Sequence, residues 1–162
     1  MPLAKIQDML QVHIHVTTES TRLFLPAMMN QRQGGIINIA SVAGFIPIPY
    51  MAEYAATKAF IISFSEAIAM EARESGVTIQ VCCPGYTETN FHQTANHHPR
   101  HILPAQTPHD VVQTSLNALK SNTTLVTIGW PGVAAQLMVR VMPKRWLMRL
   151  TGRFVRPNSP SQ

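Results

Sequence analysis

The chain lacks long apolar runs and contains little cysteine. No stretch approaches the ~18 consecutive apolar residues of a transmembrane helix, and the residues after Met1 lack the charged-then-apolar pattern of a secretory signal. We therefore expect a cytoplasmic protein. Its two cysteines, Cys82 and Cys83, are adjacent on a predicted strand, so their side chains point to opposite faces and a disulfide between them is not expected.

Glycine is missing where a phosphate-binding turn would need it. The eight glycines fall at positions 34, 35, 44, 76, 85, 129, 132 and 152, and none forms a G-x-G-x-x-G-like run between a strand and a helix. The sequence therefore contains no turn of the kind that holds a dinucleotide pyrophosphate at a helix N-terminus.

The apolar pattern instead predicts alternating helices and strands. With 162 residues and 46% hydrophobic content, the chain can bury one core. We expect helices over residues 4–30, 51–75, 108–120 and 133–150, and strands over 35–40, 77–83 and 124–128. This alternation favours a parallel α/β sheet with flanking helices.

Ser41, Tyr54 and Lys58 are the candidate catalytic residues. Tyr54 and Lys58 are four residues apart on a predicted helix, so they share a face on which the ammonium can favour phenolate over phenol. A free phenol has a pKa near ~10, and such a shift brings it toward the range useful for proton transfer. Ser41 follows an apolar run typical of a buried strand, at the sheet edge where open α/β folds bind ligands. The alternatives are a pair of surface neighbours and a serine that caps a turn or helix.

The ordered combination of these segments resembles the classical short-chain dehydrogenase/reductase family. The strand, Ser41, the Gly/Pro-rich loop and Tyr54-Ala-Ala-Thr-Lys58 follow one another in the family's order, and the likeness runs from about Met9 to Phe91. The family's strand followed by Pro-Gly and a threonine is matched as well. The resemblance implies that this segment holds the nicotinamide end of NADP or NAD through Pro84, Gly85, Thr87 and Thr89.

The resemblance implies a partial, Rossmann-like, doubly wound parallel sheet with about three strands. Family members begin with a strand, a glycine-rich turn and a helix that bind the cofactor, and this sequence has no such turn. We therefore expect the carboxyl-terminal part of a dehydrogenase, with residues 1–150 as a truncated domain and 151–162 as a basic, flexible tail.

The implied function is an NAD(P)-dependent oxidoreductase that transfers hydride between nicotinamide and a carbonyl or alcohol. Tyr54 would exchange a proton with the substrate oxygen, Ser41 would hydrogen-bond it, and Lys58 would lower the pKa of Tyr54 and hold the nicotinamide ribose. His13 stands where the family usually carries a catalytic Asn that organises a water; if protonated, it would be a second cation near Lys58, and ordinary helix packing is the alternative. The alternative is a catalytically inactive remnant, or a truncated gene model, that at most pairs with a dehydrogenase subunit.

Partners follow from the same resemblance. The helices over 4–30 and 51–75 correspond to the family's subunit interface, so we expect a homo-oligomer. Residues 90–107 correspond to a lid over the substrate, and Ile46, Ile48 and Phe91 suggest an apolar pocket. A metal site is not expected at His92, His97, His98 and His101, because Pro99 interrupts any helix that would align them.

The carboxyl-terminal segment is basic. It supplies the net charge of +5 through Arg140, Lys144, Arg145, Arg149, Arg153 and Arg156. A basic amphipathic helix can lie on an anionic membrane, but it can equally cap a sheet, and Pro143 interrupts the pattern. We therefore favour packing over peripheral membrane contact, and we expect no nucleic-acid binding because no recognisable reading motif is present.

Overall fold

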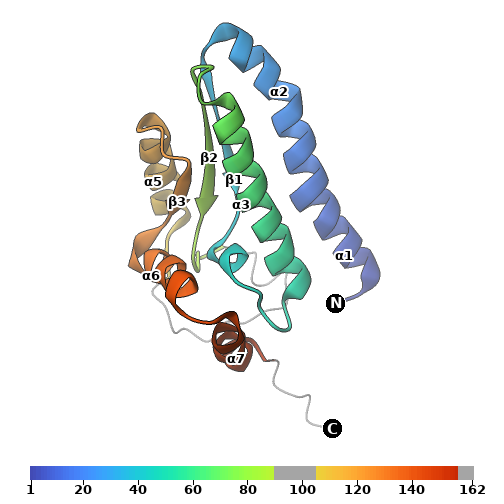
Figure 1. The fold of residues 1–162 in the computed structure, drawn as a ribbon. Helices are drawn as coiled ribbons and strands as arrows, with labels where there is room; N and C mark the ends of the chain where they lie inside the picture. Colours follow the sequence, from blue (N-terminus) through green and yellow to red (C-terminus); the bar gives the residue numbers. More distant parts are fainter. Residues whose placement is uncertain (90–104, 157–162) are drawn as a thin grey trace.

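The computed structural model describes residues 1–89 and 105–156 (Figure 1). A nearly continuous helix opens the chain, and helices and strands then alternate. In chain order the elements are α1 (Leu3–Leu10), a π-helical turn η1 (Gln11–Val16), α2 (Thr17–Gln31), β1 (Gly34–Ile39), a 3-10 turn η2 (Val42–Phe45), α3 (Ala52–Ala72), β2 (Val77–Cys83), α5 (Pro108–Lys120), β3 (Leu125–Thr127), α6 (Gly129–Val141) and α7 (Lys144–Val155).

The three strands form one parallel sheet in the order β1-β2-β3. The predicted parallel α/β sheet is therefore confirmed. Strand β2 is central, and six of its seven residues are buried, which agrees with its nearly continuous apolar sequence.

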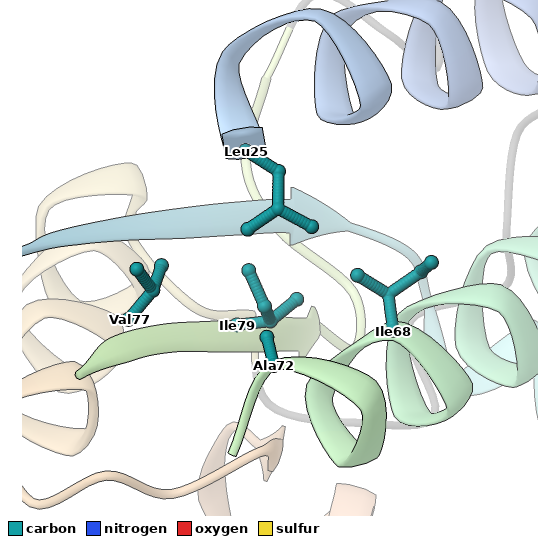
Figure 2. Close-up of a cluster of buried hydrophobic side chains, with 5 residues drawn as sticks. All are labelled: Leu25, Ile68, Ala72, Val77 and Ile79. Carbon is teal, nitrogen blue, oxygen red and sulfur yellow. The ribbon is translucent and has the colours of Figure 1, made fainter. Parts of the chain in front are cut away.

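Helices α2 and α3 cover one face of the sheet and α5 covers the other (Figure 1). Alternate residues of β2 point to the two layers, because successive side chains of a strand face opposite sides. On the α2–α3 side, one core cluster is formed by Leu25, Ile68, Ala72, Val77 and Ile79 (Figure 2). Cys83 joins a second cluster on that side and Cys82 a third beneath α5; both thiols are free and buried, as expected from their adjacent positions.

Local sequence signals explain several boundaries. The predicted limits 77–83 and 108–120 coincide with β2 and α5. Thr107 caps α5 by accepting a hydrogen bond from the amide of Asp110 at 3.1 Å, and Pro108 occupies the first turn. Gly76 has φ +77°, and a Cβ there would lie 2.5 Å from the carbonyl oxygen of Arg32, so the connection to β2 requires glycine.

The last helix was predicted wrongly as one element over 133–150. The structure has two helices, α6 and α7, separated at Pro143, whose ψ of 134° is extended. Proline cannot donate the backbone hydrogen bond that a continuous helix needs, so the chain turns there. Helix α7 continues to Val155, so the predicted tail begins inside a helix, and residues 157–162 lie outside the described part.

Two other limits differ by a few residues. Helix α3 ends at Ala72 rather than 75, and β3 is confined to Leu125–Thr127. The first helix is confirmed over its predicted length, but it contains the π-helical turn Gln11–Val16. Among the described residues, no helix is both long and apolar enough to cross a bilayer.

Candidate functional site

A cavity of about 560 Å³ lies where β1 and β2 end. The lining comes from η1, the end of β1, η2, α3, the segment that follows β2 and the start of α5, so residues far apart in the sequence meet there. All eight predicted site residues line this one cavity: His13, Ser41, Tyr54, Lys58, Pro84, Gly85, Thr87 and Thr89.

Ser41 continues the direction of β1 in an extended conformation, with φ −170° and ψ 156°. Its hydroxyl oxygen accepts a hydrogen bond from the Ala43 amide at 3.2 Å, so it does cap the turn η2. The same side chain hydrogen-bonds Tyr54. The capping role and the predicted role at the site are therefore compatible, because the cap fixes the hydroxyl beside the phenol.

The turn η2 packs closely on α3 at Gly44. A Cβ on Gly44 would lie 2.7 Å from the carbonyl carbon of Lys58 and from the side chain of Ile62. Only glycine permits this approach of two backbones. The contact brings Ser41, three residues before Gly44, against the helix that carries Tyr54.

Tyr54 does not have the lowered pKa that we expected. Burial raises its pKa above the ordinary value, and the hydrogen bond with Ser41 opposes this shift without reversing it. The Lys58 Nζ lies 5.7 Å from the centroid of the Tyr54 ring. The direction of the Tyr54 pKa shift is therefore opposite to the expected one, because loss of solvation outweighs the hydrogen bond with Ser41.

Lys58 is directed toward the end of β1. The side chain is buried, and its Nζ donates a hydrogen bond to the Ile39 carbonyl at 3.1 Å. Burial lowers the pKa of Lys58 to about 8, so the amine is still mostly protonated at neutral pH. Because the Ile39 carbonyl is its one hydrogen-bond partner among residues 1–89 and 105–156, the other ammonium protons are available to a ligand in the cavity.

His13 reaches the site from the π-helical turn. Its Nδ1 lies 2.9 Å from the Thr57 hydroxyl, and that hydroxyl donates to the Tyr54 carbonyl at 2.8 Å. Because the Thr57 proton is used there, Nδ1–H of His13 must donate to Thr57, and Nε2 carries the acceptor lone pair. The His13 and Tyr54 rings meet edge to face with centroids 5.9 Å apart.

Burial, together with the charge of Lys58, lowers the pKa of His13 to about 4. The imidazole is therefore neutral at pH 7, and it does not add a second cation beside Lys58. A neutral ring with a defined tautomer can accept a hydrogen bond from water through Nε2.

The segment after β2 is held by Gln106. The side-chain oxygen of Gln106 accepts from the Gly85 amide at 3.3 Å, while its Nε2 donates to the Ile128 carbonyl. Its backbone adds bonds to Tyr86 and Glu88 at 2.9 and 3.0 Å. One residue thus fixes the predicted nicotinamide-binding segment to the end of β3.

Two of these residues were missed by the sequence analysis. Thr57 was recognisable as a hydroxyl one helical turn after Tyr54. Gln106 gave no signal, because its two partners lie 21 and 22 residues away in the chain.

The apolar lining differs from the predicted one. Val42, Met51, Val111 and Val112 line the cavity, whereas Ile46 and Ile48 are not part of its described lining. Phe91, the four loop histidines and residues 90–104 of the lid predicted over 90–107 lie outside the described residues. Within residues 1–89 and 105–156, no group of three His, Cys, Asp or Glu side chains is arranged to hold a metal ion.

Comparison with known proteins identifies the same family as the sequence motifs did. The profile of the short chain dehydrogenase family matches residues 1–100. A ketoacyl reductase of Nostoc sp. is 35% identical over 127 residues, covering 78% of this chain and 44% of that protein. A very-long-chain 3-oxoacyl-CoA reductase of Danio rerio is 30% identical over 149 residues, covering 88% of this chain and 46% of that protein. The chain therefore spans about half the length of these curated relatives.

Solved structures share the fold. A short-chain dehydrogenase from Sphingobium yanoikuyae in complex with NADPH superposes with a TM-score of 0.74 at 22% sequence identity. The superposition covers 100% of this chain and 61% of that one. The predicted partial Rossmann-like fold is thereby confirmed.

Proposed function

The chain belongs to the short chain dehydrogenase family, and on this premise we propose that it carries the proton-transfer site of an NAD(P)-dependent oxidoreductase acting on a carbonyl or alcohol. The observation that supports this most strongly is the convergence of all eight predicted residues on one cavity. Chance would not bring side chains from four separate segments to the carboxyl ends of the same two strands.

The residues present fit the nicotinamide end of the cofactor. Lys58 offers a cation with unused donors, and the segment from Pro84 to Thr89 offers backbone and hydroxyl groups along the same cavity wall. Bound there, the cofactor would supply or accept the hydride. The relatives of known structure include one with NADPH, so NADPH is the first cofactor to test.

Tyr54 is the proposed acid. Its raised pKa keeps the phenol protonated at neutral pH, which suits donation of a proton to a carbonyl oxygen during reduction. The hydrogen bond to Ser41 orients the phenol, and the Ser41 hydroxyl can bind the same substrate oxygen. His13 holds Thr57, which in turn contacts the Tyr54 carbonyl, so it stabilises the first turn of α3 around the acid.

Two observations favour the alternative of an inactive remnant. Lys58 binds the Ile39 carbonyl, and the pKa of Tyr54 is raised rather than lowered. In this arrangement Lys58 would have to turn toward the cofactor before it could assist Tyr54. A chain that never binds cofactor would retain Tyr54 and Lys58 but would not carry out proton transfer with them.

We also propose that the chain forms homo-oligomers through α1–α2 and α3. Large apolar side chains are exposed on these helices: Leu23, Phe24, Phe60 and Met70. Exposed apolar area of this kind is typical of subunit interfaces.

The proposed function is tested by titrating the purified chain with NADPH and NADH while following nicotinamide fluorescence. We expect saturable binding that Lys58→Ala weakens at least tenfold, because the cation would contact the ribose. Tyr54→Phe should retain most binding and abolish turnover of carbonyl substrates. Lys120→Ala, at an exposed lysine on α5, is the matched control. Absence of binding at millimolar cofactor, in a folded sample, would support the inactive alternative.

A further inference from the structure

Charge is strongly segregated along the chain. All eight acidic residues lie at or before Asp110, whereas seven of the thirteen lysines and arginines follow it. The part after Asp110 therefore has a formal charge of +7, and the part up to Asp110 has −2, since six cations stand there against eight anions. Most of the cations after Asp110 belong to α6, α7 and their junctions, so this end of the molecule favours an anionic partner.

Helix α7 has one buried side and one exposed side. On the buried side, Leu147 is only 2% exposed, and Gly152 lies against Pro49 in the loop that precedes α3. The exposed side carries two adjacent rows, each with four-residue spacing: an apolar row of Trp146, Leu150 and Phe154, and a basic row of Arg145, Arg149 and Arg153. On a helix, such spacing keeps each row on one stripe of the surface.

Helix α6 adds a second apolar row. Trp130 is 70% exposed and Val141 is 87% exposed, and Val133 and Leu137 lie between them on the same stripe. The two helices follow one another at the lower end of the molecule, beyond the carboxyl ends of the strands (Figure 1).

We propose that the exposed side of α7, a segment for which the sequence alone favoured packing, binds an anionic membrane surface. The basic row of α7 would contact lipid phosphates and carboxylates, while Trp146, Leu150 and Phe154 would insert at the boundary of headgroups and acyl chains. Tryptophan suits this boundary because its ring is apolar and its N–H can still reach water or headgroups.

The side-by-side rows distinguish a lipid surface from other anionic partners. A nucleic acid would be held by the arginines alone and would gain little from an exposed row of leucine and phenylalanine on a helix. A second copy of this face would bring arginine rows of like charge together. An anionic bilayer accommodates both rows at once, because its charge lies directly above its apolar layer.

Vesicle flotation tests the proposal with the full chain. We expect the protein to float with vesicles of equimolar phosphatidylcholine and phosphatidylserine, and not with phosphatidylcholine alone. Replacing the basic row (Arg145→Gln, Arg149→Gln, Arg153→Gln) or the apolar row (Trp146→Ser, Leu150→Ser, Phe154→Ser) should each weaken binding at least tenfold.

A matched control removes the same charge elsewhere. Lys5→Gln on α1, Arg22→Gln on α2 and Arg73→Gln, just after α3, are all at exposed positions and should leave flotation unchanged. In a Trp130→Phe background Trp146 is the sole tryptophan, so its fluorescence should shift to the blue on anionic vesicles and not on neutral ones. All altered side chains are exposed, so circular dichroism should show that the variants are folded. A variant with only two changes, Arg149→Glu and Arg153→Glu, is a second test and should also lose binding to anionic vesicles.

Three results would overturn the proposal. One is equal binding to neutral and anionic vesicles, and another is an equal loss in the control triple. The third is binding of a labelled duplex RNA that is tighter than vesicle binding at the same salt and insensitive to the apolar-row substitutions, which would identify a nucleic-acid surface instead.

Discussion

At the scale of single residues, His13 shows how burial changes the chemistry of a side chain. The ring is fixed by the Thr57 hydroxyl, which in turn binds the Tyr54 carbonyl. Burial and Lys58 lower the pKa of His13 to about 4, whereas a histidine in the unfolded chain titrates near 6.5. The π-helical turn that carries His13 is a geometry that often occurs at functional sites.

This depressed pKa predicts a pH-dependent loss of stability. Between pH 6.5 and about 4, the unfolded chain binds a proton at His13 that the folded chain resists, so the free energy of unfolding falls as the pH falls through this window. The expected contribution is on the order of 1–2 kcal/mol, after allowance for partial solvent exposure of the ring. His13→Asn should remove it, as measured by urea unfolding at several pH values.

The control for this experiment is His15→Asn, because His15 is exposed on the same turn. The difference in the free energy of unfolding between wild type and His13→Asn, taken at each pH, separates the contribution of His13 from that of the carboxylates that also titrate. Parallel pH profiles for the two proteins would show that His13 is not held neutral by the fold.

At the scale of elements, the exposed edge of β1 accounts for the position of Lys58. The amide of Ala40 donates to the Cys82 carbonyl of β2 at 2.8 Å, so the alternate residue Ile39 directs its backbone groups away from β2. Within the described residues, β1 is one of the two edge strands, and Lys58 provides the Ile39 carbonyl with a donor. A strand paired along this edge would compete for that carbonyl and release the ammonium.

The segment after β2 depends on a distant element, which makes Gln106 a testable residue. Gln106→Met would keep the size of the side chain and leave the Gly85 amide and the Ile128 carbonyl without this partner. We expect the free energy of unfolding to fall by about 1–3 kcal/mol. Hydrogen exchange at the Gly85 amide should accelerate by a larger factor than the fall in the free energy of unfolding alone would produce.

Gln33→Met, at an exposed glutamine between α2 and β1, is the control for the methionine substitution. Gln106→Glu offers a finer distinction, because it keeps the acceptor for Gly85 and loses the donor to Ile128. Unchanged exchange at Gly85 in Gln106→Met would mean that other contacts hold this segment.

At the scale of the whole molecule, packing on both faces of one sheet unites the elements. The cluster around Ile68 joins α2, α3 and β2, and the cluster around Val126 joins β3 to the layer of α5 (Figure 2 shows the first). Gln80 joins β2 to α5: it is fully buried, and its Nε2 donates to the Ser115 carbonyl of α5 at 3.1 Å. Removing a buried side chain from one cluster should therefore lower the free energy of unfolding of the whole domain.

Ile68→Ala tests this cohesion. Ile68 is 1% exposed, and removing its side chain should lower the free energy of unfolding by about 2–5 kcal/mol through lost burial and a residual cavity. The control is Leu116→Ala on α5, where the side chain is 41% exposed and the loss should stay below about 1 kcal/mol. Equal losses in the two variants, measured by urea unfolding, would contradict the observed core.

The sequence by itself determined most of the elements and the candidate residues. Apolar runs and capping residues are local, so β2, α5 and the cap at Thr107 could be read from neighbours in the chain. The order and spacing of Ser41, Tyr54 and Lys58 were sufficient to indicate the family and the group of residues that lines the cavity.

Only the tertiary structure decided how these residues behave. The pKa of Tyr54 is raised, Lys58 binds a strand carbonyl, and Gln106 holds the segment after β2. Each of these facts depends on burial or on a partner distant in sequence. Solvation and long-range hydrogen bonds are properties of the packed molecule, so no local pattern of residues contains them.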